Sequence, residues 1–469
     1  MANAALVLAA GKGTRMHSDK PKVLQNILSE PLLTHVLRAL RPIFHNNIWT
    51  VIGHQAEMVR KKLADDNLNF IMQAEQKGTG HALMQALPTL IAEQCEYVLV
   101  VNGDAPLLQT EMIQSFINSA HKIQDVYEKT NIGQDLVFAT MYVPEDNAYG
   151  RVVRNQGKIG QDIQAIVERK DYDEIIHGKP TGEVNVGLYL LYVPMLAKLL
   201  PLLSNDNQSG EYYLTDLVKL AREHSYGVHA ILYEDKKILK QLLGVNTPRE
   251  LVQAEEILRK DLVERAIDSG VIIHSLDSVI LGAEVKLSPG AEIFGPCEIY
   301  GKSSVAKGAI INSHCVLRDV HVDEGTEVFS FCYLQESDIG KNSLIGPFAR
   351  LRPGNHIKEK VKIGNFVELK KSTLSKGAKA SHLSYIGDTQ VGEAANIGAG
   401  TIVCNYDGKN KFPTQIGAKA FIGSNAALVA PVNVGESAVV GAGSVITKDV
   451  PDEFLAVARG KQKNLLRKK

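Results

Sequence analysis

Single aliphatic residues recur at every sixth position in two long runs within the second half of the chain. The members of the two runs are Leu281, Leu287, Ile293, Ile299, Val305, Ile311 and Leu317, and then Ile416, Ile422, Leu428, Val434, Val440 and Ile446. A six-residue period matches neither the turn of an α-helix nor the alternation of a strand. It predicts a solenoid in which each hexapeptide forms a short strand and a turn, with the aliphatic side chain pointing inward. Because 45% of the chain is hydrophobic, one match would mean little, but two unbroken runs argue against fortuitous spacing in an ordinary β domain.

The length, charge and cysteines of the chain restrict the class of protein. A chain of 469 residues is too long for one hydrophobic core, so we expect two or three domains. Lysine plus arginine and aspartate plus glutamate number 52 each, so no net field attracts nucleic acid or membrane, and phosphate binding requires a local pocket. The five cysteines are scattered without a Cys-x-x-Cys pair, which indicates reduced thiols and argues against a zinc site or a disulfide framework. The apolar N-terminus lacks a basic segment and no apolar stretch is long enough to span a bilayer, so we expect a cytoplasmic protein.

The first half of the chain alternates strand-like and helix-like segments. The strand-like segments are short, apolar and partly β-branched: Ala5–Ala10, Ile48–Ile52, Phe70–Met72 and Tyr97–Val101. Helical patterns lie between them at Leu32–Phe44, Gln55–Leu63 and His81–Leu90. This alternation predicts an α/β domain with a mainly parallel, Rossmann-like sheet and helices on both faces. In such sheets ligands bind beyond the carboxyl ends of the strands.

A glycine-rich loop follows the first predicted strand, in the segment from Leu8 to Met16. Its glycines allow successive backbone N–H groups to face a phosphate. The loop is neither a Walker A motif nor a dinucleotide fingerprint, because the Lys-Ser/Thr pair and the third glycine are missing. Lys12, Arg15 and Lys22 place three cations beside it, as a polyphosphate leaving group requires.

The loop and the Pro21-Lys22 pair resemble the signature of the sugar-nucleotide pyrophosphorylases. The segment from Gln73 to Ala82 is similar to the base-binding segment of the bacterial N-acetylglucosamine-1-phosphate uridylyltransferases. The resemblance continues in the family's order through Gly103-Asp104, Tyr149-Gly150-Arg151, Val167-Glu168, Glu183-Val184-Asn185, Gly210-Glu211-Tyr212-Tyr213 and Gly244-Val245-Asn246.

The resemblance implies roles for individual residues of the first half. The uridine nucleotide and the sugar phosphate would be held by Leu8, Ala9, Ala10, Gly11, Lys22, Gln73, Gly78, Thr79, Asn102, Gly103, Asp104, Gly150, Glu168, Asn185 and Asn246. Asp104 and Asn246 would bind Mg²⁺, a hard cation that prefers oxygen ligands. Arg15 and Lys22 would be catalytic, neutralising charge while the sugar 1-phosphate attacks the α-phosphorus of UTP and expels pyrophosphate. Asn102 stands where some relatives have Tyr, and Val186 where a small hydroxyl residue is common, which could alter a ribose or sugar contact.

A helix is expected between the two halves. Thr247 suits the N-cap, Pro248 the first helical position, and Glu250, three residues after Thr247, the glutamate of a capping box. Apolar residues recur from Leu251 to Ala266, and Gly270 can end the helix. We interpret it as a spacer, and therefore expect a first domain at 1–247, a linker helix at 248–270 and a repeat domain with a basic tail at 271–469.

Polar and charged residues gather where the six-residue period is interrupted. Cations, a histidine, a glutamate and amide side chains there suit a phosphorylated sugar beside a general base. The bacterial N-acetylglucosamine-1-phosphate uridylyltransferases are bifunctional, and these residues resemble their second, acetyltransferase domain. The resemblance implies that His382 is the general base. Glu368 would orient either the sugar or His382. The acetyl acceptor would be bound by Arg352, Lys370, Tyr385 and Asn396. Acetyl-CoA would contact Ala399, Asn405, Tyr406, Ser424, Ala442 and Arg459.

The resemblance also implies an architecture and an activity. The repeat domain would be a left-handed parallel β-helix that forms a homotrimer, and the enzyme would make UDP-N-acetylglucosamine, a precursor of bacterial cell-wall polymers. Glucosamine 1-phosphate, acetyl-CoA and UTP would be its substrates, with Mg²⁺ as cofactor and without nucleic acid or membrane insertion. One alternative is a pyrophosphorylase for another sugar with a regulatory β-helix, against which His382, Arg352 and Lys370 count. Another is a non-catalytic subunit of the same two folds, against which Lys22, Asp104 and Asn246 count.

Overall fold

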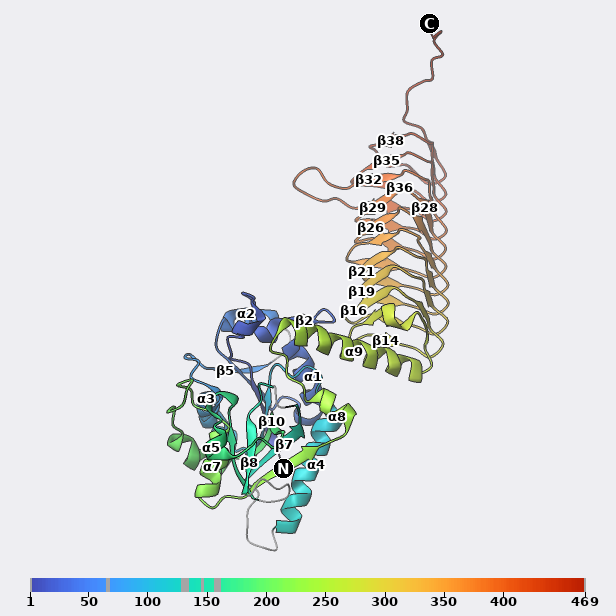
Figure 1. Cartoon of the computed structure of the whole chain (residues 1–469). Coiled ribbons are helices and arrows are strands. Elements are labelled where there is room, and N and C mark those ends of the chain that lie inside the picture. The colour runs from blue at the N-terminus through green and yellow to red at the C-terminus, as the bar shows by residue number, and fades with distance from the viewer. Residues whose placement is uncertain (1, 65–67, 128–134, 145–146, 156–161, 468–469) are drawn as a thin grey trace. The chain divides into compact units, whose positions relative to one another are not determined.

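The computed structural model describes residues 2–64, 68–127, 135–144, 147–155 and 162–467 (Figure 1). The chain divides into two compact units, Met1–Leu258 and Arg259–Lys469, which we call unit 1 and unit 2. Each unit has its own hydrophobic core. The end of the basic tail, residues 468–469, lies outside the described residues.

Unit 1 is built on one twisted, mainly parallel sheet. Its strand order is β11-β7-β10-β6-β1-β4-β5. The bounds of these strands in chain order are β1 Ala2–Leu8, β4 Ile48–Ile52, β5 Asn69–Met72, β6 Tyr97–Asn102, β7 Leu136–Tyr142, β10 Glu183–Tyr192 and β11 Val228–Tyr233. Strands β1, β4, β5 and β6 are mutually parallel, as predicted. Strand β10 runs antiparallel to β6 and β7, and β8 (Arg151–Arg154) pairs with β9 (Ile163–Val167) beside it, features that the alternation of strands and helices did not indicate.

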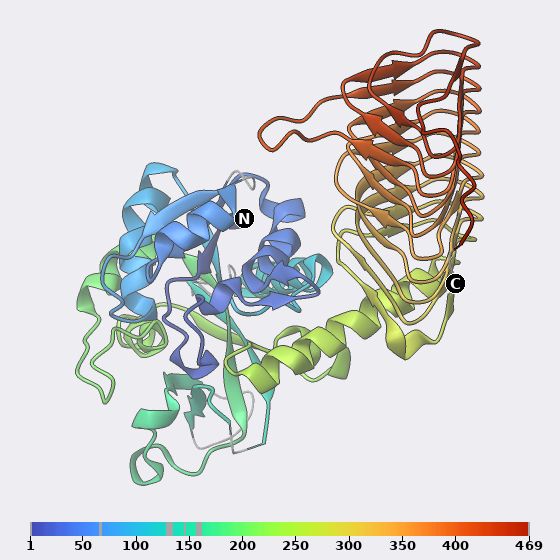
Figure 2. The same ribbon diagram turned by 90° about the horizontal axis from the view of Figure 1, so that it is seen from above.

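Helices cover both faces of this sheet, because successive strand residues are buried in different cores. Ala5 and Val7 belong to the core under α1 (Leu32–Phe44), α2 (Ala56–Lys62) and α4 (Thr110–Tyr127). Ala4 and Leu6 belong to the core under α3 (Thr79–Ala92), α6 (Val193–Leu199) and α7 (Asp216–Glu223). The predicted strand and helix positions in this half are therefore confirmed to within a few residues at each end, and Figure 2 shows the layers from above.

The parallel strands bring distant loops to one edge of the sheet. Leu8 at the end of β1 is in register with Asn102 at the end of β6. The glycine-rich loop and the Gly103-Asp104 turn therefore leave the sheet side by side. The Gly103 N–H donates to the carbonyl of Leu8 at 2.9 Å and fixes this junction.

Helix α9 spans Pro248–Asp268, where the linker helix was expected. The capping box forms as predicted: the Thr247 N–H donates to Oε2 of Glu250 at 2.9 Å, and the Glu250 N–H donates to the Thr247 hydroxyl at 3.2 Å. Gly270 follows the helix with a φ of +95°, a conformation that favours glycine.

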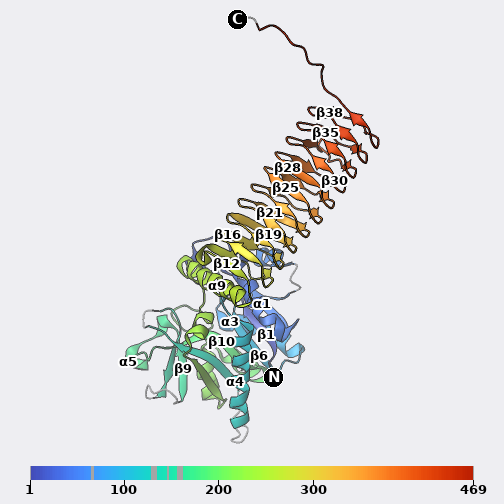
Figure 3. The same ribbon diagram turned by 90° about the vertical axis from the view of Figure 1, so that its right-hand side faces the viewer.

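Unit 2 is a coil of short parallel strands, as the six-residue period predicted (Figure 3). One wall consists of β12 Ile272–His274, β15 Glu292–Phe294, β18 Ile310–Ile311, β20 Glu327–Val328, β22 Leu344–Ile345, β25 Lys362–Asn365, β28 Lys379–His382, β31 Asn396–Ile397, β34 Phe421–Ile422, β37 Val439–Val440 and β39 Leu455–Ala456. The second set comprises β13 Val279–Leu281, β14 Lys286–Leu287, β16 Cys297–Tyr300, β17 Ser304–Val305, β19 Cys315–Val322, β21 Tyr333–Ile339, β23 Arg350–Leu351, β24 Asn355–Ile357, β26 Glu368–Lys370, β27 Thr373–Leu374, β29 Tyr385–Gly387, β30 Thr389–Val391, β32 Ile402–Cys404, β33 Thr414–Ile416, β35 Ala427–Val429, β36 Val432–Val434 and β38 Val445–Ile446.

The aliphatic residues of the two runs line the interior of this coil. Every member is buried except Leu287, which is partly buried. Residues one coil apart stack, as in the column formed by Leu281, Ile299 and Leu317. Between β32 and β33 the chain leaves the wall as a protruding loop (Figure 1). Across the described residues, we find no helix with the length and apolar character that crossing a membrane would require.

Candidate active sites

The glycine-rich loop of unit 1 borders a cavity of about 510 Å³. Its lining includes the loop residues Leu8, Ala9, Ala10, Gly11 and Lys12, together with Lys22, Gln73, Gly78, Thr79, Asn102 and Asp104. Gly13 adopts a φ of +62° with its Cα against the side chain of Lys22, where a Cβ would collide. The loop therefore needs glycine here to bring its backbone beside a cation.

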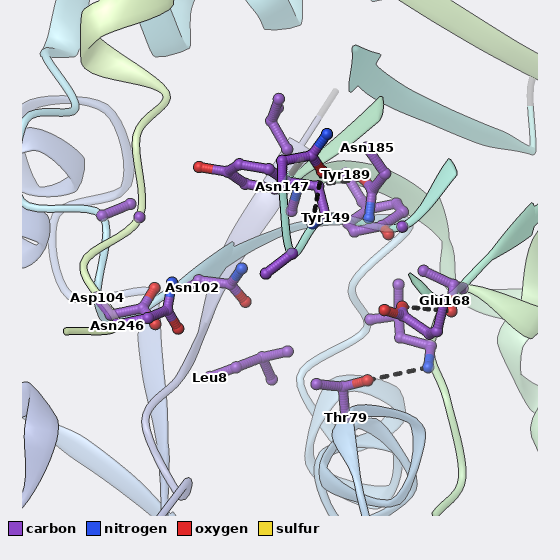
Figure 4. A pocket seen from close by; sticks show the side chains of 18 of the residues that line it. Leu8, Thr79, Asn102, Asp104, Asn147, Tyr149, Glu168, Asn185, Tyr189 and Asn246 are labelled. Atoms are coloured by element: carbon purple, nitrogen blue, oxygen red, sulfur yellow. Dashed lines mark hydrogen bonds between the residues drawn. The ribbon is translucent and has the colours of Figure 1, made fainter. Parts of the chain in front are cut away.

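A second cavity of about 360 Å³ adjoins the first. It contains Arg15, Gly150, Glu168, Asn185 and Asn246. Leu8, Thr79, Asn102 and Asp104 line both cavities, so the two meet at the carboxyl ends of β1 and β6 (Figure 4). Of the residues predicted to bind the nucleotide and the sugar, only Gly103 lines neither cavity. Its backbone N–H donates to the carbonyl of Leu8, which lines both.

Charged and amide groups converge where the cavities meet. The Lys22 ammonium contacts the Asp104 carboxylate and lies 3.1 Å from Oδ1 of Asn246. Arg15 donates to the same Asn246 oxygen at 2.9 Å. The side chains of Lys22 and Asp104 are only 14% and 16% exposed, so solvent screens this cluster weakly.

The donor set at this point fits a hard divalent cation. One ammonium group reaches both the Asp104 and the Asn246 oxygen, so the two oxygens converge on a single position. A cation such as Mg²⁺ uses one or two protein oxygens and completes its shell with water and substrate phosphates. Across the described ranges, no group of three or more His, Cys, Asp or Glu side chains could hold a metal ion.

Glu168 lies at the far end of the second cavity. Burial raises the pKa of its carboxyl, and the Thr215 hydroxyl, which donates to Oε1 at 3.1 Å, opposes that shift. Gly150 faces this carboxylate, since a Cβ at position 150 would lie 3.4 Å from the same oxygen. Asn185 is buried and accepts a hydrogen bond from the Gly187 N–H at 3.1 Å.

Several lining residues were missed by the sequence reasoning. They are Asn147, Tyr149, Tyr189, Thr215 and Glu250. Oε2 of Glu250 accepts from the Asn246 N–H at 2.6 Å as well as from Thr247, so the capping box also holds the backbone of the predicted metal ligand. That reach was foreseeable from the capping motif. Tyr149 stood in a quoted motif without being given a role, whereas Asn147, Tyr189 and Thr215 carried no distinct motif.

In unit 2, His382 ends β28 and its side chain is exposed. Its Nδ1 lies 2.7 Å from Oδ1 of Asn365, the residue in register on β25. Because an amide oxygen can only accept, Nδ1 carries the proton and Nε2 is left as the basic nitrogen. Asn365 was not identified from the sequence.

A charged network lies on the neighbouring wall. Arg352 donates to Oε1 of Glu368 at 3.2 Å, and Glu368 is in register with Tyr385. Lys370 is buried and lies 3.6 Å from Asp388, whose carboxylate also accepts from Asn405 at 2.5 Å.

Lys411 in the protruding loop adds a cation beside Lys370. Its contact with the Lys370 side chain lowers the pKa of the Lys411 ammonium. Two adjacent ammonium groups favour an anion between them. The structure thus places Arg352, Lys370, Tyr385 and Asn405 on or beside adjacent strands of one wall, and Lys411 lies beside Lys370.

Four of the predicted cofactor residues form a ladder in successive coils. The Ala399 carbonyl accepts from the Asn425 N–H at 2.7 Å, the Ser424 carbonyl from the Gly443 N–H at 2.8 Å, and the Ala442 carbonyl from the Arg459 side chain at 2.7 Å. Tyr406 lies apart on the protruding loop, where its hydroxyl donates to the Gly408 carbonyl. Asn396 is on β31, which pairs with the strand of His382.

Two family comparisons define the class of the protein. Residues 5–204 match the MobA-like NTP transferase domain, and residues 413–448 match the hexapeptide repeat of succinyl-transferase. The chain is thus a nucleotidyltransferase domain joined to a hexapeptide-repeat domain.

Curated relatives match over nearly the whole chain. The bifunctional protein GlmU of Nitratidesulfovibrio vulgaris (strain Hildenborough) is 53% identical over 99% of this chain and 98% of the relative. Those of Lawsonia intracellularis and Acinetobacter baumannii (strain ACICU) are 48% and 40% identical, over 100% and 98% of this chain and 98% and 97% of the relatives. The chain belongs to the family of bifunctional GlmU proteins.

Proposed function

We propose that the chain catalyses two consecutive steps of UDP-N-acetylglucosamine synthesis. Unit 2 transfers the acetyl group of acetyl-CoA to the amine of glucosamine 1-phosphate. Unit 1 then transfers the uridylyl group of UTP to the product and releases pyrophosphate. The observation that carries the proposal is the meeting of two cavities at Lys22, Asp104 and Asn246, which suits a nucleotide and a sugar phosphate bound end to end.

In unit 1 the chain positions two anions and neutralises their charge. The backbone of Ala9, Ala10 and Gly11 faces the nucleotide, while Glu168 and Asn185 hold the sugar. Asp104 and Asn246 would hold Mg²⁺, which would supply charge neutralisation at the phosphates. Lys22 and Arg15 stabilise the charge that develops as the sugar phosphate oxygen displaces pyrophosphate from the α-phosphorus in line.

In unit 2 His382 acts as the general base. Asn365 holds its Nδ1–H, so Nε2 accepts a proton from the glucosamine amine as the nitrogen attacks the thioester carbonyl. The C–S bond breaks and coenzyme A leaves as its thiol. Arg352, Lys370 and Lys411 supply the cations for the sugar phosphate, and the ladder from Ala399 to Arg459 suits an extended cofactor along the coil.

A column of exposed rings supports self-association of unit 2. His314, Phe331, Phe348 and Phe366 stack in successive coils with centroid separations of 4.7, 4.9 and 5.3 Å. The next coil continues the column at Leu383, directly after His382. A contiguous exposed apolar stripe favours burial against another chain. The number of three copies and the left-handed sense of the coil are what the family resemblance implies, and the cytoplasmic location is what the scattered cysteines and the apolar N-terminus predict.

We retain the proposed division into residues 1–247, 248–270 and 271–469. The first part carries the uridylyltransferase residues, the second is helical and the third carries the acetyltransferase residues. The catalytic groups of the two reactions therefore lie in separate parts of the chain, and the intermediate is released between steps.

The proposal is tested with the purified full chain, glucosamine 1-phosphate, acetyl-CoA, UTP and Mg²⁺. Thiol release and pyrophosphate release are followed separately. We expect thiol release without UTP, and pyrophosphate release from glucosamine 1-phosphate only when acetyl-CoA is present. Pyrophosphate release without acetyl-CoA would overturn the order of the steps, and an absence of thiol release would overturn the acetyltransferase function.

A further inference from the structure

The hydroxyl of Thr215 donates a hydrogen bond to the carboxylate of Glu168. Thr215 is only 5% exposed and lines the same cavity as Glu168, to whose Oε1 it donates at 3.1 Å (Figure 4 shows Glu168 at the cavity wall). We infer that Thr215 is a positioning residue that orients Glu168 toward the sugar phosphate in unit 1. This inference rests on the proposed uridylyltransferase function.

The Thr215 side chain makes its hydrogen bond to Glu168 and none to the first turn of α7. Thr215 is the N-cap residue of α7, where a threonine hydroxyl normally accepts a hydrogen bond from the first turn of its own helix. No such cap bond forms from this side chain. The backbone of Thr215 is helical, with φ −59° and ψ −28°, and its hydroxyl donates to Glu168 across the cavity wall.

The backbone beside Thr215 is fixed to the nucleotide side of the site. The Leu214 N–H donates to the Thr79 hydroxyl at 3.0 Å, and the Gly80 N–H donates to the Tyr212 carbonyl at 2.8 Å. Thr79 begins α3 and lines both cavities. Leu214 and Thr215 therefore connect Thr79, at the start of α3, to Glu168 through two hydrogen bonds.

The direction of the hydrogen bond defines the roles of the two carboxylate oxygens of Glu168. Because the hydroxyl donates, Oε1 acts as an acceptor, and Oε2 remains available for a hydroxyl or amide N–H of the sugar. The charged groups around Glu168 come from three neighbouring elements: Asp216 on α7 and Asp171 near β9 raise its pKa, and Arg151 on β8 lowers it.

Tyrosines also face this carboxyl. Glu168 raises the pKa of the buried Tyr189 hydroxyl on β10, after the larger effect of burial, and contributes in the same direction at Tyr213. Both phenols stay neutral near pH 7. The Thr215 hydrogen bond is thus the contact that most strongly opposes the rise in the pKa of Glu168 that burial causes.

The test uses the full chain with Thr215→Val, which keeps the shape and removes the hydroxyl, and Thr215→Ser, which keeps the hydroxyl. Thr110→Val is a matched control, because the Thr110 hydroxyl donates to the Ala39 carbonyl at 2.9 Å in the same unit and does not line either cavity. Pyrophosphate release is measured while N-acetylglucosamine 1-phosphate and UTP are varied in turn, at several pH values.

For Thr215→Val we expect about a tenfold rise in KM for the sugar phosphate and little change in KM for UTP, since one hydrogen bond to a charged group is lost. The acid limb of the pH profile should move to higher pH, because Glu168 becomes easier to protonate. Thr215→Ser should restore both properties, and Thr110→Val should change neither.

Other outcomes would overturn the inference. An unchanged KM for the sugar phosphate in Thr215→Val would show that Glu168 needs no positioning. Equal losses for both substrates, or for the serine variant, would indicate a structural role only. If the unaltered chain releases no pyrophosphate from UTP and N-acetylglucosamine 1-phosphate, the proposed function itself fails, which is a separate result.

Discussion

The ammonium of Lys22 lies 3.1 Å from the side-chain oxygen of Asn246, although 224 positions separate the two residues. The same ammonium contacts Asp104, so the segment after β1, the turn after β6 and the segment that leads into α9 meet at one point. This convergence places a positive charge and two oxygens suited to metal binding, from Asp104 and Asn246, at the junction of the two cavities of unit 1.

Replacing Lys22 with Met should slow pyrophosphate release by about a hundredfold, because a charge that stabilises the transition state is lost. The acetyl-transfer rate should be unchanged. Rate measurements at saturating substrates test this, and a Lys22→Met variant with normal pyrophosphate release would remove Lys22 from the catalytic groups.

Replacing Glu250 with Ala should weaken the apparent affinity for Mg²⁺ by about tenfold, since Glu250 holds the backbone of Asn246 at 2.6 Å. Titrating Mg²⁺ while following pyrophosphate release measures the change. A lower maximal rate at an unaltered Mg²⁺ requirement would indicate that Glu250 acts only on helix α9.

Replacing Asn365 with Ala should reduce acetyl transfer by roughly tenfold to a hundredfold, because His382 loses the acceptor that fixes its tautomer. Asn365→Asp restores an acceptor and should recover much of the rate. Thiol release is the readout, and full activity of the alanine variant would show that His382 is oriented by other contacts.

The interior of the coil provides a test of stability. Leu369 is fully buried in unit 2, so Leu369→Ala should lower the free energy of unfolding of that unit by about 2–5 kcal/mol. Ile402 is 43% exposed on the same wall, and Ile402→Ala should cost far less. Heat inactivation of acetyl transfer compares the two variants, and equal losses would contradict the inward direction of the repeat.

The period of six residues was sufficient to predict the inward-facing residues of the regular runs but not the pairing within the site. Most coils are 17 or 18 residues long, as the separations between Asn365 and His382 and between Asn355 and Ser337 show. Some coils thus omit one residue, and residues such as Phe348 and Phe366 adopt positive φ at the corner of the coil. Pure six-residue counting loses register there, which is why Asn365 was missed.

In unit 1 the sequence motifs located the residues at the ends of β1 and β6, because parallel strands place such residues at one edge. Thr215 was not found, because it lies outside the motif Gly210-Glu211-Tyr212-Tyr213 and a single threonine carries no signal of its own. The antiparallel strand β10 was also missed, since its apolar run resembles that of a parallel strand. Only the three-dimensional packing distinguishes these cases.

The central claim is that two independent active sites act in sequence, and two variants test it together. His382→Ala should abolish thiol release yet release pyrophosphate from N-acetylglucosamine 1-phosphate, and Asp104→Ala should do the reverse. The most direct measurement is the formation of UDP-N-acetylglucosamine from glucosamine 1-phosphate, acetyl-CoA and UTP by an equal mixture of the two variants. We predict that neither variant forms the product alone and that the mixture does. A mixture without product, although each folded variant keeps its remaining activity, would contradict release of the intermediate, and loss of both activities in either variant would contradict two separate sites.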